Sequence, residues 1–354
     1  HADAVIFRED LVYLSSRIEP FGLQPNKEFK THLYWETEDV DIGDYGLNFT
    51  IRHDLGYTYH FIEIKDIPAI FELLDSVGLT SGMASGDGPR PIMTSPVGGI
   101  DAEEIIDASV IATEIDTYFD ENEDRFCNFP RKYKIGVSGC SRHAAAHEIQ
   151  DVAFTAFKEG EEVLFDLTVA GGLSKSKQIA YRANRYVKPE QVKDVAVVCA
   201  EIFRDHGNRA NRNKARVRHL VNDWGVEKFV EEIETRLGYA LQEGTVEPVI
   251  TAFDKRDHFG IHKAKQEGES FIGFATNSGR VPGEDFVKLS DICTKYNAGG
   301  MALTSTQNFI IYGVKDEDAQ ALADEVDALG YPYAPSPFRA RLQSCTGSQF
   351  CKFG

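Results

Sequence analysis

The sequence lacks several features that would assign it to a class at once. It contains no apolar run of the roughly 18 residues that a membrane-spanning helix requires. Residues 1–5 include neither a cationic start nor an apolar core, so we expect no signal peptide there. The predicted protein is therefore cytoplasmic and has no membrane partner.

Cysteine is scarce, with six residues in 354 at irregular spacing. This low number argues against a disulfide framework and favours a reducing compartment. Neither G-x-G-x-x-G nor a P-loop is present, so the common phosphate-binding loops are not predicted.

Positively charged residues are fewer than negatively charged ones, with 38 Lys and Arg against 56 Asp and Glu, so the net charge is -18. Such a balance disfavours nonspecific binding to nucleic acid or to anionic lipid, and we predict no nucleic-acid partner. Any site for an anion must then come from a local cluster of cations that overcomes the overall field.

The periodicity of apolar residues predicts an α+β protein. We expect strands at 61–64, 134–138, 163–169 and 309–312, and helices at 68–78, 192–203, 211–220, from 223 onward and at 316–329. The pattern Thr-x-x-(His/Gln)-(Asp/Asn), strand, helix, Gly occurs in the first part and again near the end. An internal duplication explains this repetition, although β–α units can share turn chemistry by chance.

Two segments are candidates for binding an anion. The loop Gly-Asp-Gly-Pro-Arg-Pro at 86–91 presents Arg90 from a backbone that two prolines restrict. Lys132 and Lys134 alternate on the approach to a strand and so face the same way. An anion between them would explain two like charges on one face, whereas a solvated strand edge is the alternative.

A third segment, 208–218, is a basic run in an acidic protein. At helical spacing Arg212 and Arg216 would share a face suited to carboxylates or phosphates, and the alternative is an ordinary surface helix. The turn at Gly171 and Gly172 could let the backbone approach a flat cofactor.

Cys345 and Cys351 flank a small Gly-containing turn. Cysteine thiolates are the usual ligands of iron–sulfur clusters, which normally need four of them. These two would supply half of a cluster's ligands, whereas a buried thiol is the better reading of Cys199 and Cys293.

Seven collinear segments resemble the siroheme-containing sulfite and nitrite reductases, which also carry a 4Fe-4S cluster. They are 78–96, 128–134, 146–154, 171–174, 203–229, 303–308 and 345–351. The resemblance implies duplicated ferredoxin-like units around a larger mixed α/β siroheme-binding domain. It also implies the six-electron reduction of sulfite to sulfide, or of nitrite to ammonia, with ferredoxin or a similar donor.

The resemblance implies roles for particular residues. Substrate anions would meet Arg90, Lys132 and Lys134, and Cys345 and Cys351 would bind the cluster. Cofactor-binding residues would be Arg52, Arg131, Gly171, Gly172, Arg212, Lys214, Arg216, Gln307 and Thr346. Lys at both 132 and 134 favours sulfite, because plant-type nitrite reductases tend to have Asn at the second position. A noncatalytic tetrapyrrole-binding relative is the alternative from another class.

The domain boundaries that follow are an arm at 1–46, a first repeat at 47–100, a siroheme-binding domain at 101–241, a linker at 242–257, a second repeat at 258–338 and the start of a cluster-binding domain at 339–354. The family's second cluster motif, Cys-x-x-x-Cys, is not found within the sequence. We therefore expect the other cluster ligands from a continuation of the polypeptide or from a second chain.

Overall fold

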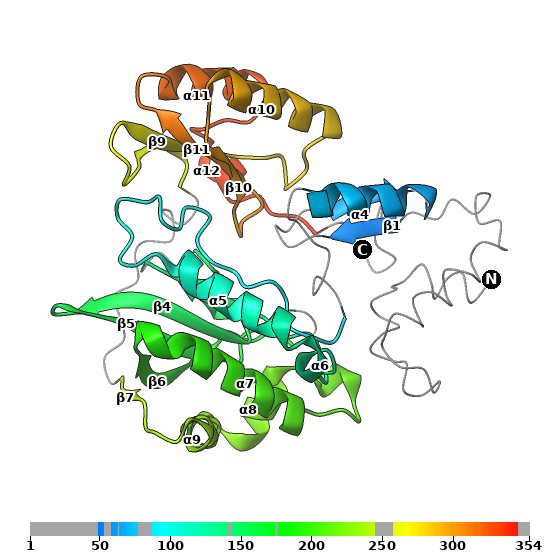
Figure 1. Ribbon diagram of the computed structural model, residues 1–354, viewed down its shortest axis with the longest axis vertical. Helices are drawn as coiled ribbons and strands as arrows, with labels where there is room; N and C mark the ends of the chain where they lie inside the picture. Colours follow the sequence, from blue (N-terminus) through cyan, green and yellow to red (C-terminus); the bar gives the residue numbers. More distant parts are fainter. Residues whose placement is uncertain are drawn as a thin grey trace.

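The computed structural model describes residues 49–52, 58–62, 64–76, 86–140, 144–173, 176–244 and 258–345. The predicted arm at 1–46, most of the predicted linker, and the predicted site residues Thr346 and Cys351 lie outside these residues. Three groups of elements make up the described part (Figure 1). No helix in these ranges combines the length and the apolar character needed to cross a membrane.

The largest group is built on a five-stranded sheet of order β3-β4-β5-β6-β7. β3 and β4 are parallel and the remaining neighbours are antiparallel. The strands are β3 (Ile135–Ser138), β4 (Val152–Glu159), β5 (Glu162–Val169), β6 (Tyr181–Val187) and β7 (Gln242–Glu243). The predicted strands at 134–138 and 163–169 are therefore confirmed to within a residue.

Helices cover this sheet, and Figure 1 shows α5 and α7 lying across the same face. The helices of this group are α5 (Ala108–Glu121), α6 (Glu123–Phe126), α7 (Val192–His206), α8 (Val217–Trp224) and α9 (Val226–Leu237), with 3-10 turns η4 (His147–Ile149), η5 (Pro189–Gln191) and η6 (Arg212–Lys214). Asp107 begins α5 by accepting a hydrogen bond from the backbone N–H of Ser109. Residues 195–200 of α7 are buried without a break, so this helix lies within the core and packs on more than one side.

The predicted continuous helix at 211–220 is wrong. Asn side chains interrupt it, because Asn208 Oδ1 accepts hydrogen bonds from the N–H groups of Ala210 and Asn211. Such local bonds offer the backbone an alternative to the helix. Arg212 consequently lies in a 3-10 turn and Arg216 is extended at the start of α8, so they do not share a helix face. The helix expected from 223 begins instead at Val226, after Gly225 at a φ of 87°.

The second group is a four-stranded antiparallel sheet of order β10-β11-β9-β8. Its elements are β8 (Gly260–Lys263), β9 (Glu269–Phe274), α10 (Gly283–Lys295), β10 (Gly300–Leu303), β11 (Phe309–Lys315), α11 (Ala319–Ala328) and the short α12 (Pro337–Ala340). Figure 1 shows α10 and α11 on one face, with the opposite face turned toward the larger group. On that face Phe271 and Ile310 pack with Val97 of the larger group.

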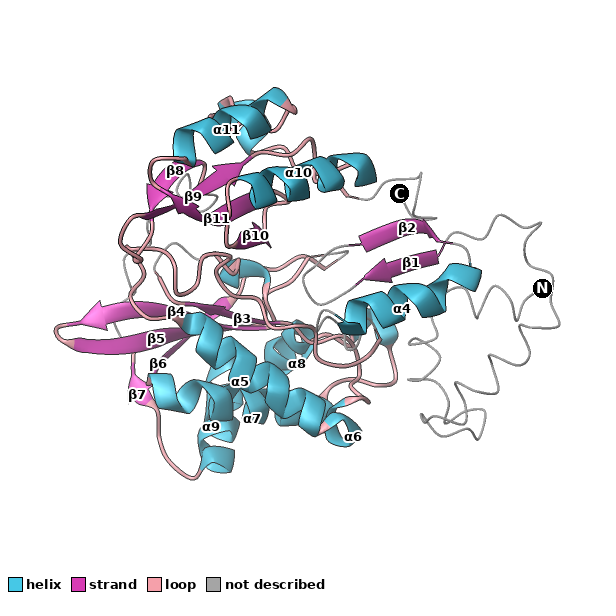
Figure 2. Cartoon of the chain, turned by 45° about the horizontal axis from the view of Figure 1, so that its top comes forward, coloured by secondary structure: helices cyan, strands magenta, loops and turns pink. Residues whose placement is uncertain are grey.

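The third group is an antiparallel hairpin with one helix, drawn to one side of the other two groups in both views (Figure 2). It consists of β1 (Phe49–Arg52), β2 (Thr58–Ile62), the 3-10 turn η3 (Ile64–Asp66) and α4 (Ile67–Ser76). The order strand, strand, helix is that of β10, β11 and α11 in the second group. The two copies of the sequence pattern therefore form the same series of elements, as expected for a duplication.

Candidate functional site

The loop that carries Arg90 is joined to the segment that carries the two lysines. The N–H of Arg90 donates to the carbonyl of Tyr133 at 2.8 Å, and the N–H of Tyr133 donates to the carbonyl of Gly88 at 3.0 Å. The Arg90 guanidinium turns back on its own loop and donates to the carbonyls of Gly86 at 2.9 Å and Gly88 at 3.4 Å. Gly86 has a φ of 86°, a conformation that favours glycine, so the loop geometry that places this cation depends on that residue.

Lys132 and Lys134 alternate with a fully buried tyrosine. Tyr133 is 0% exposed, its ring stacks on Phe203 with centroids 5.9 Å apart, and its hydroxyl donates to the carbonyl of Ala196. Both lysines are partly exposed on the other side of the backbone. The alternation predicted for this segment is therefore present, although β3 itself begins one residue later, at Ile135.

The electrostatic environment of Lys132 is cationic. Burial, followed by the positive charges of Lys134, Arg216, Arg90 and Arg131 in that order, together lower the pKa of Lys132 to about 8. These five side chains come from three segments that lie far apart in the sequence. The fold thus gathers positive charge at one place in a protein whose net charge is -18.

Two buried carboxylates hold this cluster together. Asp87 is 6% exposed, receives a two-pronged ion pair from Arg212, and lies 3.6 Å from the guanidinium of Arg131. Asp151 is 0% exposed, pairs with Arg216 at 2.7 Å, and accepts the backbone N–H of Lys134 at 3.0 Å. Each of these two carboxylates is thus bonded to an arginine of the basic run.

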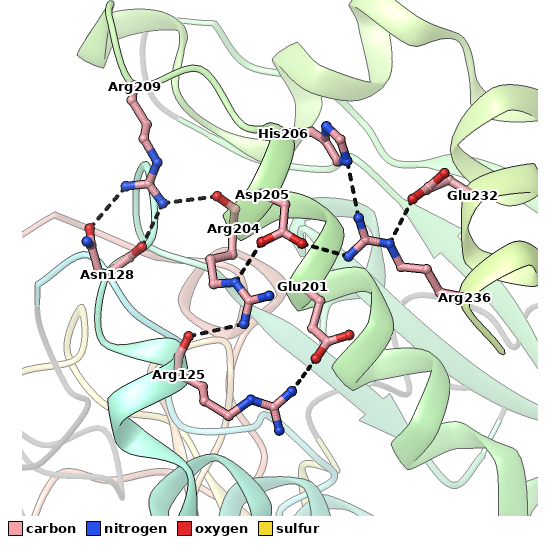
Figure 3. Close-up of polar contacts among 9 residues, drawn as sticks. All are labelled: Arg125, Asn128, Glu201, Arg204, Asp205, His206, Arg209, Glu232 and Arg236. Atoms are coloured by element: carbon pink, nitrogen blue, oxygen red, sulfur yellow. Dashed lines mark hydrogen bonds and ion pairs between the residues drawn. The ribbon is translucent and has the colours of Figure 1, made fainter.

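A peripheral network supports the same region from outside (Figure 3). Arg209 belongs to the basic run, yet its guanidinium donates to the side chain and carbonyl of Asn128 and to the carbonyl of Arg204. Arg236 extends this network by pairing with Asp205 at 2.8 Å. Arg209 therefore ties the end of α7 to the start of the lysine segment.

The two glycines of the turn after β5 pack against polar atoms. A Cβ at Gly171 would come within 2.6 Å of the carbonyl oxygens of Gln150 and Glu148. A Cβ at Gly172 would lie 2.3 Å from Nη1 of Arg218. Gly171 is thus required by neighbouring backbone, whereas at Gly172 the absent side chain leaves room for a guanidinium.

Arg218 itself is 4% exposed, and its Nε and Nη1 find no hydrogen-bond partner among the described residues. Burial lowers the pKa of this guanidinium, and the charge of neighbouring Arg216 adds to the effect. A buried cation with unused donors is costly unless an anionic group meets it. This site therefore has the chemistry to receive a carboxylate.

The remaining predicted site residues lie elsewhere or are described only in part. Gln307 lies between β10 and β11, and its side chain bonds to Ser344. Lys214 is exposed in η6, and for Arg52 only the backbone of β1 is described.

The thiol of Cys345 is exposed, whereas Cys199 is fully buried and burial raises its pKa strongly. Cys345 is thus the more accessible of these two cysteines.

Two domains of one protein family match the chain in sequence. Residues 85–241 match the nitrite and sulphite reductase 4Fe-4S domain, and residues 262–329 match the nitrite/sulfite reductase ferredoxin-like half domain. The chain belongs to the sulfite and nitrite reductase family.

Relatives in this reductase family carry names of both activities. The chain is 37% identical to sulfite reductase [ferredoxin] 2 of Mycolicibacterium paratuberculosis, over 83% of this chain and 52% of that protein. It is 32% identical to ferredoxin--nitrite reductase of Synechococcus elongatus, over 82% of this chain and 57% of that protein. The solved structure of the Mycobacterium tuberculosis NirA protein matches with a TM-score of 0.78 and 35% identity, over 86% of this chain and 55% of that one. The chain therefore spans about half the length of the curated relatives it matches, and its resemblance to the reductases and its fold class are confirmed.

Three polar residues of this site were missed in the sequence. Asp87 and Asp151 occur as single acids in mixed stretches, and their arginine partners lie 125 and 65 positions away. Arg218 closes the basic run, but its burial depends on the turn at Gly172. No local signal in the sequence identifies that burial.

Proposed function

We propose that this chain provides the siroheme- and substrate-binding part of a reductase that converts sulfite to sulfide. The observation that carries the proposal is the convergence of Arg90, Arg131, Lys132, Lys134 and Arg216 on one place. An oxyanion gains from fixed cationic donors, and it would relieve the repulsion among these charges.

Siroheme has peripheral carboxylates, and the protein offers a group that fits one of them. Arg218 is buried with unused donors, and its guanidinium lies against the bare backbone of Gly172. Arg212 and Arg216 each already hold a carboxylate of the protein, Asp87 and Asp151 respectively. Arg218 is therefore the member of the basic run with the greatest need for an external anion.

When bound, siroheme and an iron–sulfur cluster would supply the electrons and the iron that such a reduction requires. The chain's own residues would bind the anion and deliver protons as its oxygens leave as water. Arg90 would orient the anion because its guanidinium is held by carbonyls of its own loop. Lys132 would donate a proton from Nζ, since a pKa of about 8 makes both protonation states available near neutral pH.

Sulfite is the preferred substrate in this proposal, and nitrite is the alternative from the same family. Lys at both 132 and 134 favours sulfite, whereas relatives named nitrite reductase match the chain nearly as well as those named sulfite reductase. Ferredoxin or a similar protein is the proposed electron donor, because it appears in the names of several relatives.

Arg218→Met tests the siroheme site with two readouts that move in opposite directions. The variant removes a buried charge that lacks a partner among the described residues, so the protein without cofactor should be at least as stable to heat as wild type. Siroheme affinity, measured by visible absorbance on titration, should fall roughly tenfold or more, as expected for one charge-assisted hydrogen bond worth about 1.5–3 kcal/mol.

Arg236→Met is the matched control, because Arg236 belongs to the exposed network around Asp205. It should lose a little stability and leave siroheme affinity unchanged. If Arg218→Met binds siroheme as wild type does, or if wild type binds none, the proposed site is wrong.

A further inference from the structure

Gln307 adopts an unusual backbone conformation that its surroundings impose. Its φ is 68°, in the left-handed region that non-glycine residues rarely occupy. Thr276 holds this turn by donating its hydroxyl to the Gln307 carbonyl at 2.6 Å, while its own N–H donates to Oδ1 of Asn308 at 3.0 Å. The N–H of Asn308 in turn donates to the hydroxyl of Thr304 at 3.0 Å. Strained residues persist where the structure around them determines their conformation, as it does here.

The side chain of Gln307 is thereby aimed at the backbone of a distant segment. Its Oε1 accepts the N–H of Ser344 at 3.0 Å, and its Nε2 donates to the carbonyl of Ser344 at 2.8 Å. This is the pair of bonds that two opposed strand residues exchange, with an amide side chain in place of one strand. Gly279 lies against the same side chain, and a Cβ there would come within 2.9 Å of Gln307.

A second loop holds Ser344 at another point. The Ser344 hydroxyl donates to the carbonyl of Ser278 at 3.2 Å. The backbone and side chain of this one serine are thus bonded to two loops of the second ferredoxin-like group. Its neighbour Cys345 is exposed, so its thiol remains accessible.

We propose that Gln307 is a positioning residue that clamps the backbone of Ser344 and so fixes how Cys345 enters the iron–sulfur site. The proposal rests on the proposed function for the role of Cys345, but the clamp itself does not. A metal ligand whose supporting shell is fixed binds more firmly than one on a loose chain, because less disorder is lost on binding.

Hydrogen-exchange mass spectrometry on the protein without cofactor tests the clamp alone. In wild type the Ser344 amide is bonded to Gln307, and Gln307→Ala removes its acceptor. Exchange in overlapping peptides across 339–346 should then become at least several-fold faster. Gln343→Ala is the matched control, since Gln343 is an exposed glutamine in the same segment and does not bond to Ser344 in the described contacts. Equal exchange in Gln307→Ala and wild type would overturn the proposal.

The effect on the cluster is measured on protein that includes the segment or second chain with the remaining cluster ligands, reconstituted with iron and sulfide. Gln307→Ala should lose iron to a chelator at least several-fold faster than wild type and than Gln343→Ala. Its electron paramagnetic resonance signal should broaden, because the ligand geometry is less uniform. Faster exchange with unchanged iron loss would show that the clamp does not serve Cys345, and would overturn that part while leaving the proposed function intact. If wild-type protein takes up no cluster even with the remaining ligands present, the proposed function is contradicted, and the role of Cys345 with it.

Discussion

The proton affinity of Lys132 offers the sharpest test of the cation cluster. Burial and four neighbouring cations lower its pKa from 10.5 to about 8. At pH 8 about half of the Lys132 side chains are then neutral, against about one in three hundred for a lysine of ordinary pKa. Lys132 should therefore react with amine reagents at a pH where most lysines are protected by their charge.

Labelling with acetic anhydride at a series of pH values, read by peptide mass spectrometry, gives the midpoint for each lysine. Lys288 is the internal control, because its ion pair with Asp285 raises its pKa above the ordinary value. The midpoint should lie near 8 for Lys132 and above 10.5 for Lys288. The midpoint is compared, not the absolute rate, since the two amines differ in exposure.

Lys134→Gln removes the neighbouring charge that lowers the pKa of Lys132 most, after burial itself. The Lys132 midpoint should then move upward. A Lys132 midpoint above 10 in wild type, or one that Lys134→Gln leaves in place, would refute the idea that these cations act on one another.

The sign of the pH dependence follows from the same shift. The folded protein binds the Lys132 proton less tightly than the unfolded chain, so this residue's contribution to stability rises as pH increases from about 8 to 10.5. Anion binding has the opposite dependence, because it requires the charged form. Affinity for nitrite, which keeps a single negative charge over this range, should fall as pH rises through about 8.

Three further predictions concern the residues around the cluster. Asp151→Asn leaves buried Arg216 without its carboxylate and should lower the free energy of unfolding by about 3–5 kcal/mol in urea titrations. Glu201→Gln, at an exposed ion pair, should lower it by at most about 1 kcal/mol. Equal losses in the two variants would contradict the buried pair. Gly171→Ala would bring a methyl group within 2.6 Å of two carbonyls and should lower the melting temperature by several degrees, and an unchanged melting temperature would show that the turn can move. Lys134→Asn should weaken sulfite binding roughly tenfold and nitrite binding less, and an unchanged ratio of dissociation constants would remove the support for sulfite.

The fold class followed from local patterns in the sequence. α7 was predicted at 192–203 and observed at Val192–His206, because its apolar residues recur at helical spacing and Gly207 follows it. The alternation of Lys132 and Lys134 around buried Tyr133 was likewise visible, since side chains of an extended segment alternate. The repeated pattern before β2 and β11 correctly indicated a repeated set of elements.

Errors arose where polar side chains compete with the backbone. The stretch from 211 to 220 has helical spacing, but Asn208 and Asn211 bond to nearby N–H groups and break the helix. Periodicity records which residues are apolar, whereas the choice between a helix and a capped turn depends on these individual bonds. Two arginines predicted to share one face therefore bond to different carboxylates instead.

By itself the sequence determined the family, the main elements and the residue types that can bind an oxyanion, because each of these depends on neighbouring residues or on spacing within short segments. Only the tertiary structure decided which cations are neutralised and which are not. Asp87 meets Arg212 and Asp151 meets Arg216 across long stretches of chain, while Arg218 is buried beside Gly172 with unused donors. Charge pairing and burial are properties of residues brought together by folding, and no local pattern encodes them.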